Sequence, residues 1–281
     1  MMAFKKIILL CSIQLAACSD VPKESVTIDL GYQPNQAFTI QENVTFKMDS
    51  DYQGQRPQEL AFLLEMIPDD LEVKSERIVN LSTAAAEADG SVPLELDIQK
   101  FRNSSTEEPS SIESPEAVEL EGVRILAKQS PTGEVHFEKT LGDAQADVAD
   151  EDVLELLPQF VMYADLDQKT FEVGETLSVK MPIDELADGQ RIEDVNVLYT
   201  LNEIKDQKAY FDLKVKPGTT INIHSNTHAE ILGGGTMVYD ITRHYIPEQE
   251  TLFEMRSSTR VAIGTLKMNV SSGISTKVTL R

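Results

Sequence analysis

The sequence predicts a mainly β protein, built as an antiparallel curved sheet or a barrel-like architecture, with a short helix near the middle. Apolar residues recur at every second position through much of the chain, which is typical of strands with one buried face. Turn-forming residues separate these runs and little helical periodicity lies between them, which favours antiparallel pairing of successive strands. A partial match between residues 38–48 and 171–181 leaves open an organisation into two related halves.

The first 17 residues have the features of a secretory signal peptide. Lys5 and Lys6 precede a short apolar stretch, residues 7–15, and small residues follow it. The stretch is too short to cross a bilayer, which takes about 20 apolar residues. The end of this segment, Leu15-Ala16-Ala17-Cys18, resembles the bacterial lipobox. The resemblance implies that Cys18 is lipidated, becomes the first mature residue and anchors the protein to a membrane.

The same resemblance implies a cellular location for the protein and a division of the chain into parts. Ser19 follows Cys18, whereas an aspartate there favours inner-membrane retention in enteric-type bacteria. The resemblance therefore implies a lipid anchor in the outer membrane, on the periplasmic face rather than the cell surface. We expect four parts in the chain: a signal peptide at 1–17, the lipidated cysteine and a short tether at 18–25, an N-terminal β half at 26–149, and a short helix with a C-terminal β half at 150–281.

Three runs of alternating residues predict strands in the N-terminal half. They lie at residues 26–30, 44–48 and 94–98, each with apolar side chains on one face. A fourth strand, at residues 123–127, precedes a turn at Pro131-Thr132-Gly133 and a returning partner strand. We therefore expect a meander of short antiparallel strands in this half.

Other segments of the first half are less regular. Residues 60–67 are nearly all apolar, and they form either a strand buried on both faces or a short helix. Residues 103–117 are rich in Ser, Glu and Pro, which predicts a mobile acidic loop. Acidic residues open the segment from Asp150 to Leu157 and Pro158 ends it, so this segment is the expected short helix.

The C-terminal half has the clearest strand pattern. Residues 195–201 and 209–215 place apolar side chains on one face, and residues 202–207 are expected to form the turn between them. Near the end of the chain the apolar parity changes at Gly264-Thr265, which we interpret as a β-bulge. Ser271-Ser272-Gly273 is then expected to turn the chain into a last strand.

The match between the two halves covers 11 residues. Residues 38–48 read FTIQENVTFKM and residues 171–181 read FEVGETLSVKM, with four identities and matched apolar positions. The match indicates either a duplicated β unit or two unrelated strands with a similar pattern.

The layout also resembles a group of uncharacterised bacterial envelope lipoproteins. The lipobox carries this resemblance together with four further tracts of the chain: residues 88–92 (ADGSV), 120–135 (LEGVRILAKQSPTGEV), 171–175 (FEVGE) and 199–213 (YTLNEIKDQKAYFDL). The resemblance implies an envelope location and a β-rich body, and it transfers no catalytic residue.

Composition narrows the set of partners. The formal charge is −22, so the surface repels nucleic acid and anionic lipid headgroups. There is no Trp, which weighs against a stacking platform for sugars or bases. Only Cys11 and Cys18 are present, and removal of the signal peptide leaves Cys18 alone, so the mature fold has no disulfide.

Two segments were weighed as metal sites. The run from Asp49 to Gly54 begins like a calcium loop but lacks the bidentate carboxylate at position twelve, where Leu60 stands. It is interpreted as a polar turn between strands. His224 and His228 have a spacing that binds zinc on a helix, but the surrounding residues predict a strand and a turn, with both histidines on the surface. We predict no metal site and no cofactor.

Nothing in the chain indicates an enzyme. Gly233-Gly234-Gly235 lacks the following helix that a phosphate-binding loop needs, so it is interpreted as a tight connection or a packed glycine strand. No nucleophile elbow or reactive thiol pair is present. Acidic pairs carry little information in a chain with 47 acidic residues.

These observations predict a non-enzymatic, lipid-anchored protein whose role is binding. Its partner would be an apolar or lipid-like small molecule, or another envelope protein. A purely structural or interaction module of the envelope is the first alternative, and a hydrolase with dispersed acidic residues is the second.

Overall fold

The structure is a computed structural model that describes residues 24–54, 70–105, 121–141, 166–181, 195–224, 227–261 and 264–281. These residues form fourteen strands and, within the described ranges, no α-helix. The strands are β1 (Ser25–Thr27), β2 (Ala37–Gly54), β3 (Asp70–Thr83), β4 (Val92–Ser105), β5 (Arg124–Gln129), β6 (Val135–Leu141), β7 (Thr170–Glu172), β8 (Thr176–Met181), β9 (Val195–Lys205), β10 (Lys208–Val215), β11 (Thr220–His224), β12 (Thr227–Asp240), β13 (Tyr245–Val261) and β14 (Gly264–Leu280).

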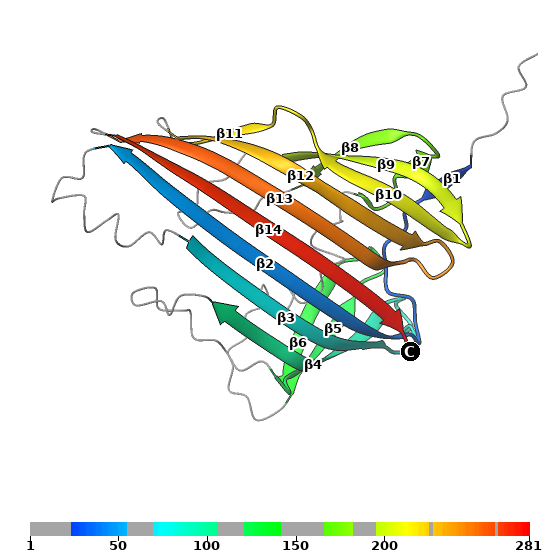
Figure 1. The fold of residues 1–281 in the computed structure, drawn as a ribbon. Helices are drawn as coiled ribbons and strands as arrows, with labels where there is room; N and C mark the ends of the chain where they lie inside the picture. The colour runs from blue at the N-terminus through cyan, green and yellow to red at the C-terminus, as the bar shows by residue number, and fades with distance from the viewer. Residues whose placement is uncertain are drawn as a thin grey trace, which may run out of the picture.

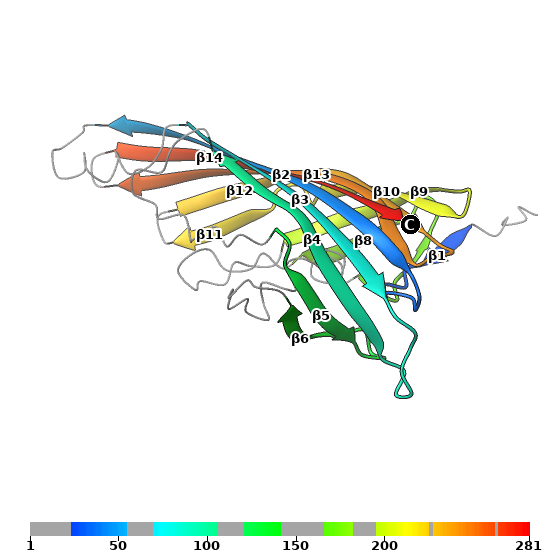
Figure 2. The ribbon, with the colours of Figure 1, turned by 90° about the horizontal axis from the view of Figure 1, so that it is seen from below.

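Twelve of these strands form one antiparallel sheet, which confirms the predicted fold class (Figure 1). Its order is β6-β5-β4-β3-β2-β14-β13-β12-β10-β9-β8, and β11 pairs with β12 beyond the end of β10. The edge strands β6 and β8 do not pair with each other, so the sheet is open. Figure 2 shows that the sheet is curved, with β5 and β6 turned away from the plane of β2, β13 and β14. Strands from residues 26–149 and from 150–281 thus share one sheet.

The centre of the sheet is the long hairpin of β13 and β14, each 17 residues, with β2 alongside. Here two predictions were wrong. The chain reverses between Val261 and Gly264, so the change of parity at Gly264 marks a hairpin and not a bulge. Ser271-Ser272-Gly273 lies inside β14 and pairs with β13 on one side and β2 on the other. Pairing with the backbones of β13 and β2 keeps these three small residues in an extended conformation.

The hairpin of β9 and β10 is tighter than predicted. Strand β9 continues to Lys205, and only Asp206 and Gln207 form the turn. Both have positive φ, 51° and 61°, as a two-residue type I′ turn requires. The predicted apolar faces of both strands are confirmed, because their inward residues are all buried: Val195, Val197, Tyr199, Leu201, Ala209, Phe211, Leu213 and Val215.

Two separate cores fill the concave side of the sheet. Both are present at the end where β2 begins and β14 ends, which we call the near end, and the first core also extends along β11 and β12 through Ile221, Ala229 and Ile231 toward the other end. The first lies under β8 to β12 and centres on Phe171 and Phe211, whose rings meet edge to face at 5.1 Å. The second lies under β2 to β5 and contains Phe38, Leu96 and Ile125. The predicted inward residues of 94–98 and 123–127 belong to this second core, which confirms those two strands.

A small two-stranded sheet of β1 and β7 packs into the first core through Val26 and Phe171. The segment after β1 is fastened to the hairpin between β12 and β13. The Tyr239 hydroxyl donates to the Asp29 carbonyl at 3.0 Å, and His244 Nδ1 lies 3.4 Å from the Asp29 carboxylate. Burial raises the pKa of Tyr239 to about 12. The N-terminal segment is thereby fixed to the near end.

Several further predictions either differ from the structure or fall outside the residues that it describes. The matched segments 38–48 and 171–181 do not share a local structure, since the first lies within β2 and the second spans β7, a turn at Gly174 and β8. Cys18, residues 60–67 and the expected helix at 150–157 lie outside the described residues. In the ranges that are described, no helix is long and apolar enough to cross a membrane.

Candidate functional site

At the other end of the long strands, beyond the second core and beside the first, the concave face continues as an apolar surface, whose residues Phe253 and Met255 pack against the first core. We call it the distal inner surface. It consists of inward side chains from four adjacent strands: Leu71 and Val73 on β3; Val44, Phe46 and Met48 on β2; Leu266, Met268, Val270 and Ile274 on β14; and Phe253 and Met255 on β13. Every one of these side chains is half-buried, and none is a fully buried core residue.

Register and alternation together build this surface. Phe46 lies opposite Ser272 on one side and Val73 on the other, and Met48 lies between Val270 and Leu71. Because strand side chains alternate between faces, these residues share the concave face while Thr45 and Lys47 point outward. From Val44 to Tyr52 the surface is about 27 Å long, and its four strands span about 14 Å.

The side chains of this surface are soft as well as apolar. Three of the nine methionines of the chain, Met48, Met255 and Met268, lie in it. Methionine is flexible and polarizable, and it adapts to partners of irregular shape. The surface therefore suits a flexible apolar chain better than a rigid, tightly defined shape.

A polar row separates this surface from the near-end core under β2 to β5. Arg77, Glu42, Thr276 and Gln249 lie side by side across β3, β2, β14 and β13. Arg77 Nη2 contacts Glu42 Oε1 at 2.5 Å, and the two side chains are only 13% and 9% exposed. Burial raises the pKa of Glu42, and the contacts with Arg77 and Thr276 oppose this shift only in part. The pair offers little net charge to a ligand.

Strand β13 also carries two buried hydroxyls on its concave face. Among the residues that the structure describes, Thr251 Oγ1 and Ser257 Oγ have no hydrogen-bond partner, and the two residues are 6% exposed each. Between them on the same face stand Phe253 and Met255. Buried polar groups in native proteins nearly always have a partner, so these two hydroxyls need an explanation.

The residues that were weighed as metal ligands lie on the opposite, convex face. Asp49 and Asp51 belong to the end of β2, so the predicted polar turn is wrong and the segment is extended. They line a hollow of about 440 Å³ together with His228, Glu230, Arg256 and Lys267. Asp51 and His228 occupy one row across four strands, which puts their strands about 14 Å apart. Lys267 stands in the same row.

The other histidines are dispersed. His224 ends β11 and pairs with Thr227, which confirms the predicted strand, and Ser225 and Asn226 of the predicted turn lie outside the described residues. The His228 side chain is exposed at the distal end, His244 lies at the near end, and His136 is exposed on edge strand β6. Among the residues that the structure describes, no three His, Cys, Asp or Glu side chains gather as metal ligands.

The three glycines at 233–235 lie within β12, as the packed glycine strand predicted. Strand β12 changes partner here, from β10 to β11. A Cβ on Gly235 would lie 1.9 Å from the Glu250 carbonyl oxygen, so no larger residue fits. The glycines therefore permit the close approach of the neighbouring backbones.

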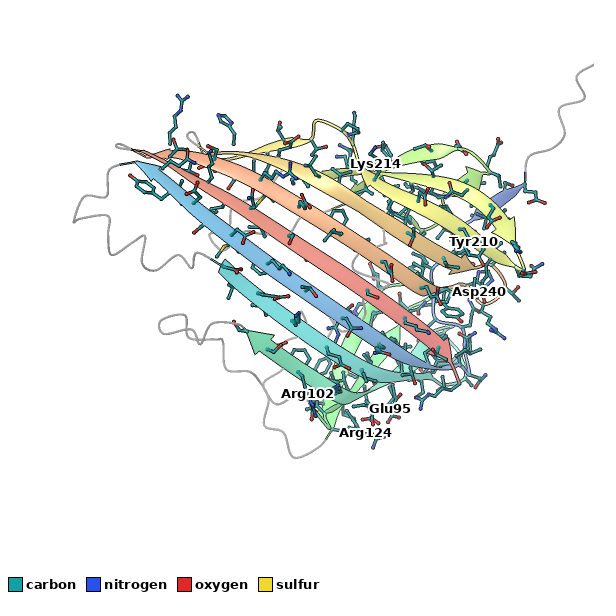
Figure 3. All side chains as sticks on the ribbon, viewed as in Figure 1. Glu95, Arg102, Arg124, Tyr210, Lys214 and Asp240 are labelled. Atoms are coloured by element: carbon teal, nitrogen blue, oxygen red, sulfur yellow. The ribbon has the colours of Figure 1, made fainter. Side chains whose placement is uncertain are left out.

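The convex face is largely polar. Figure 3 views this face, with Tyr210 and Lys214 standing on β10 and with Glu95 beside Arg124 at the other side of the sheet. Arg124 Nε donates to Glu95 at 2.9 Å. Across the described residues, Leu252 is the single large apolar residue that is exposed, at 53%. The polar convex face and the apolar concave face give the sheet two different chemistries.

Comparison with known proteins adds a distant structural match. No protein-family model and no curated protein matches this chain. A solved structure on lipid–protein interactions in lipovitellin matches 88% of this chain, with a TM-score of 0.45 and 7% identity. The chain spans 26% of that lipovitellin chain.

Two further solved structures are less similar. An outer membrane channel from Pseudomonas putida F1 has a TM-score of 0.24 at 10% identity, over 89% of this chain and 97% of the channel. The V. cholerae type IV competence pilus secretin PilQ has a TM-score of 0.16 at 9% identity, over 94% of this chain and 62% of the secretin. The comparisons name no family for the chain, and its resemblance to envelope lipoproteins stays a prediction.

Sequence reasoning missed the polar row and the extent of the concave surface. A signal was present, because both charged residues occupy inward positions of an alternating strand. Glu42 lies between the inward residues Ile40 and Val44, and Arg77 lies between the inward residues Val79 and Ser75. A charged residue at an inward position of two strands indicates a buried pair. The boundary between the fully buried core and the half-buried surface leaves no such mark in the sequence.

Proposed function

We propose that the protein is a non-enzymatic binding protein that holds a flexible apolar ligand, such as a lipid acyl chain, on the distal inner surface. The observation that carries this proposal is the continuation of half-buried inward apolar side chains on β2, β3 and β14 beyond the second core, beside the part of the first core that Phe253 and Met255 contact. Apolar patches of a few hundred Å² on a folded protein commonly mark binding sites. The dimensions above correspond to about 380 Å² of sheet, within which Ser50, Ser75 and Ser272 also face inward. The three methionines favour a ligand without a fixed shape.

The proposed location follows from the signal peptide and Cys18. We propose a lipid anchor at Cys18 in the outer membrane, with the body on the periplasmic side. The acyl chains contribute about 0.8 kcal/mol for each buried CH₂, which makes multiple acylation effectively permanent. Cys18→Ser should abolish lipid labelling and release the protein or leave its signal uncut. Unchanged labelling of that variant would contradict the anchor.

The binding proposal can be tested with the uncharged fluorescent probe diphenylhexatriene and the chain from Ser19 onward. We expect saturable binding with enhanced fluorescence. The double substitution Phe46→Gln and Val270→Asn should weaken binding at least ten-fold, because full burial of one such side chain contributes about 1.5–3 kcal/mol. The matched control is Thr45→Gln with Ser271→Asn, on the same two strands but on the convex face.

The control variant should bind the probe like the unmodified protein, and both variants should keep the same far-ultraviolet circular dichroism. Absence of saturable binding to the unmodified protein would refute the proposal. Equal binding by both variants would place the probe elsewhere on the protein. Native mass spectrometry of the protein purified from membranes would then show whether an envelope protein, rather than a lipid, accompanies it.

A further inference from the structure

The two unpartnered hydroxyls of β13 indicate which class of ligand the surface holds, an inference that rests on the proposed function. Thr251 and Ser257 are six residues apart, so their hydroxyls are about 20 Å apart along the strand. Both point to the concave face and bracket Phe253 and Met255. A purely apolar ligand would leave both hydroxyls without a partner, which is costly.

The charges near Thr251 limit the ligand further. Thr251 is one row beyond Gln249, which belongs to the polar row of Arg77, Glu42 and Thr276. Arg77 is already paired with Glu42 at 2.5 Å, so the row has no spare positive charge for an anionic headgroup. The chain as a whole carries a charge of −22 and disfavours anions.

We propose that the distal inner surface selects lipids with an uncharged, hydrogen-bonding polar group, such as an acylglycerol, over fatty acid anions. The Thr251 hydroxyl donates to an ester or hydroxyl oxygen of the ligand beside the polar row. The acyl chain runs along Phe253 and Met255, and Ser257 meets a second polar atom at the far end.

The test compares 1-monooleoylglycerol with oleate at pH 8 as competitors of diphenylhexatriene. We expect the unmodified protein to bind monooleoylglycerol at least ten-fold more tightly than oleate. Thr251→Val keeps the side-chain shape and removes the hydroxyl, and it should weaken monooleoylglycerol binding about 3- to 10-fold. Ser257→Ala should weaken it by a similar factor. The matched control is Thr236→Val, on the convex face of β12.

A second readout separates binding from folding. Replacing an unpartnered buried hydroxyl with an apolar group of the same shape is neutral or stabilising, so Thr251→Val should keep or raise the urea midpoint. A lower midpoint would mean that the hydroxyl supports the fold. That result, or unchanged monooleoylglycerol affinity in both Thr251→Val and Ser257→Ala, would overturn the inference, as would equal affinity for oleate. Failure of diphenylhexatriene to bind at all would instead refute the proposed function.

Discussion

The two ends of strand β2 carry the same pattern and have different surroundings. At the near end Phe38 and Ile40 are 1% and 2% exposed and belong to a core that β4 and β5 help to enclose. At the distal end Phe46 and Met48 repeat the alternation on the same face and are only half-buried. Between the two ends lies the buried pair of Glu42 and Arg77. Alternation thus determines which way a side chain points, and the neighbouring strands determine what covers it.

The near end should dominate stability. Phe38→Ala and Phe211→Ala each remove a fully buried ring from a filled core, and we expect each to lower the free energy of unfolding by about 3–5 kcal/mol. Urea unfolding followed by circular dichroism measures this loss. A loss below about 1 kcal/mol would mean that the near-end cores are not closely packed.

The polar row tests the boundary between the two ends. Glu42→Leu leaves the Arg77 charge buried without its partner, and we expect a loss of about 3 kcal/mol. Replacing both residues with leucine should restore most of that stability, because neither charge then needs desolvation. Urea midpoints of Glu42→Leu, Arg77→Leu and the double variant, each compared with the unmodified protein, give the coupling between Glu42 and Arg77. A double variant as unstable as Glu42→Leu would show that the row has a structural role beyond the pair.

The distal end should tolerate the same change that damages the near end. Phe46→Ala, on the same strand and face as Phe38→Ala, should lower the free energy of unfolding by only about 1–2 kcal/mol, because its ring is half-buried. The same urea titration provides the comparison. An equal loss of unfolding free energy in Phe38→Ala and Phe46→Ala would mean that the two ends of β2 are equally well packed.

The smallest expected effect concerns pH. The folded-state pKa of Glu42 is raised by burial, so the folded protein binds this proton more tightly than the unfolded chain. The contribution of Glu42 to stability therefore falls as pH rises from about 4.5 through the raised pKa. Subtracting the urea midpoints of Glu42→Gln from those of the unmodified protein, at pH 4 to 7, should reveal this fall. A difference that grows in favour of the unmodified protein with rising pH would mean that folding lowers the pKa of Glu42 instead of raising it.

The near end was largely predictable from sequence. Leu94, Leu96 and Ile98 alternate with polar residues, and the structure buries all three, because short strands with one apolar face have few other stable arrangements. The distal end was not predictable in the same way. Asp49 to Gly54 and Ser271 to Gly273 have the composition of turns, yet both are held in strands by hydrogen bonds to neighbours that are distant in sequence.

The binding surface was predicted only in outline. An inward apolar face was expected, and the alternation at residues 44–48 located part of it. Its polar border and the hydroxyls at Thr251 and Ser257 depend on how four strands align, which local patterns do not encode. The face on which each of these residues lies can be predicted from its own strand. Which residues lie opposite one another on neighbouring strands cannot.

The place of β14 has a consequence for how the protein is made. Residues 264–280 form the strand between β2 and β13, so residue 38 of the earliest long strand pairs with residue 280. During synthesis, β2 therefore has no partner on that side until the end of β14 has emerged. Its unpaired backbone is a template for aggregation during that time. Lys47, Asp49 and Asp51, spaced along the convex face of β2, are the kind of charged side chains that discourage such pairing.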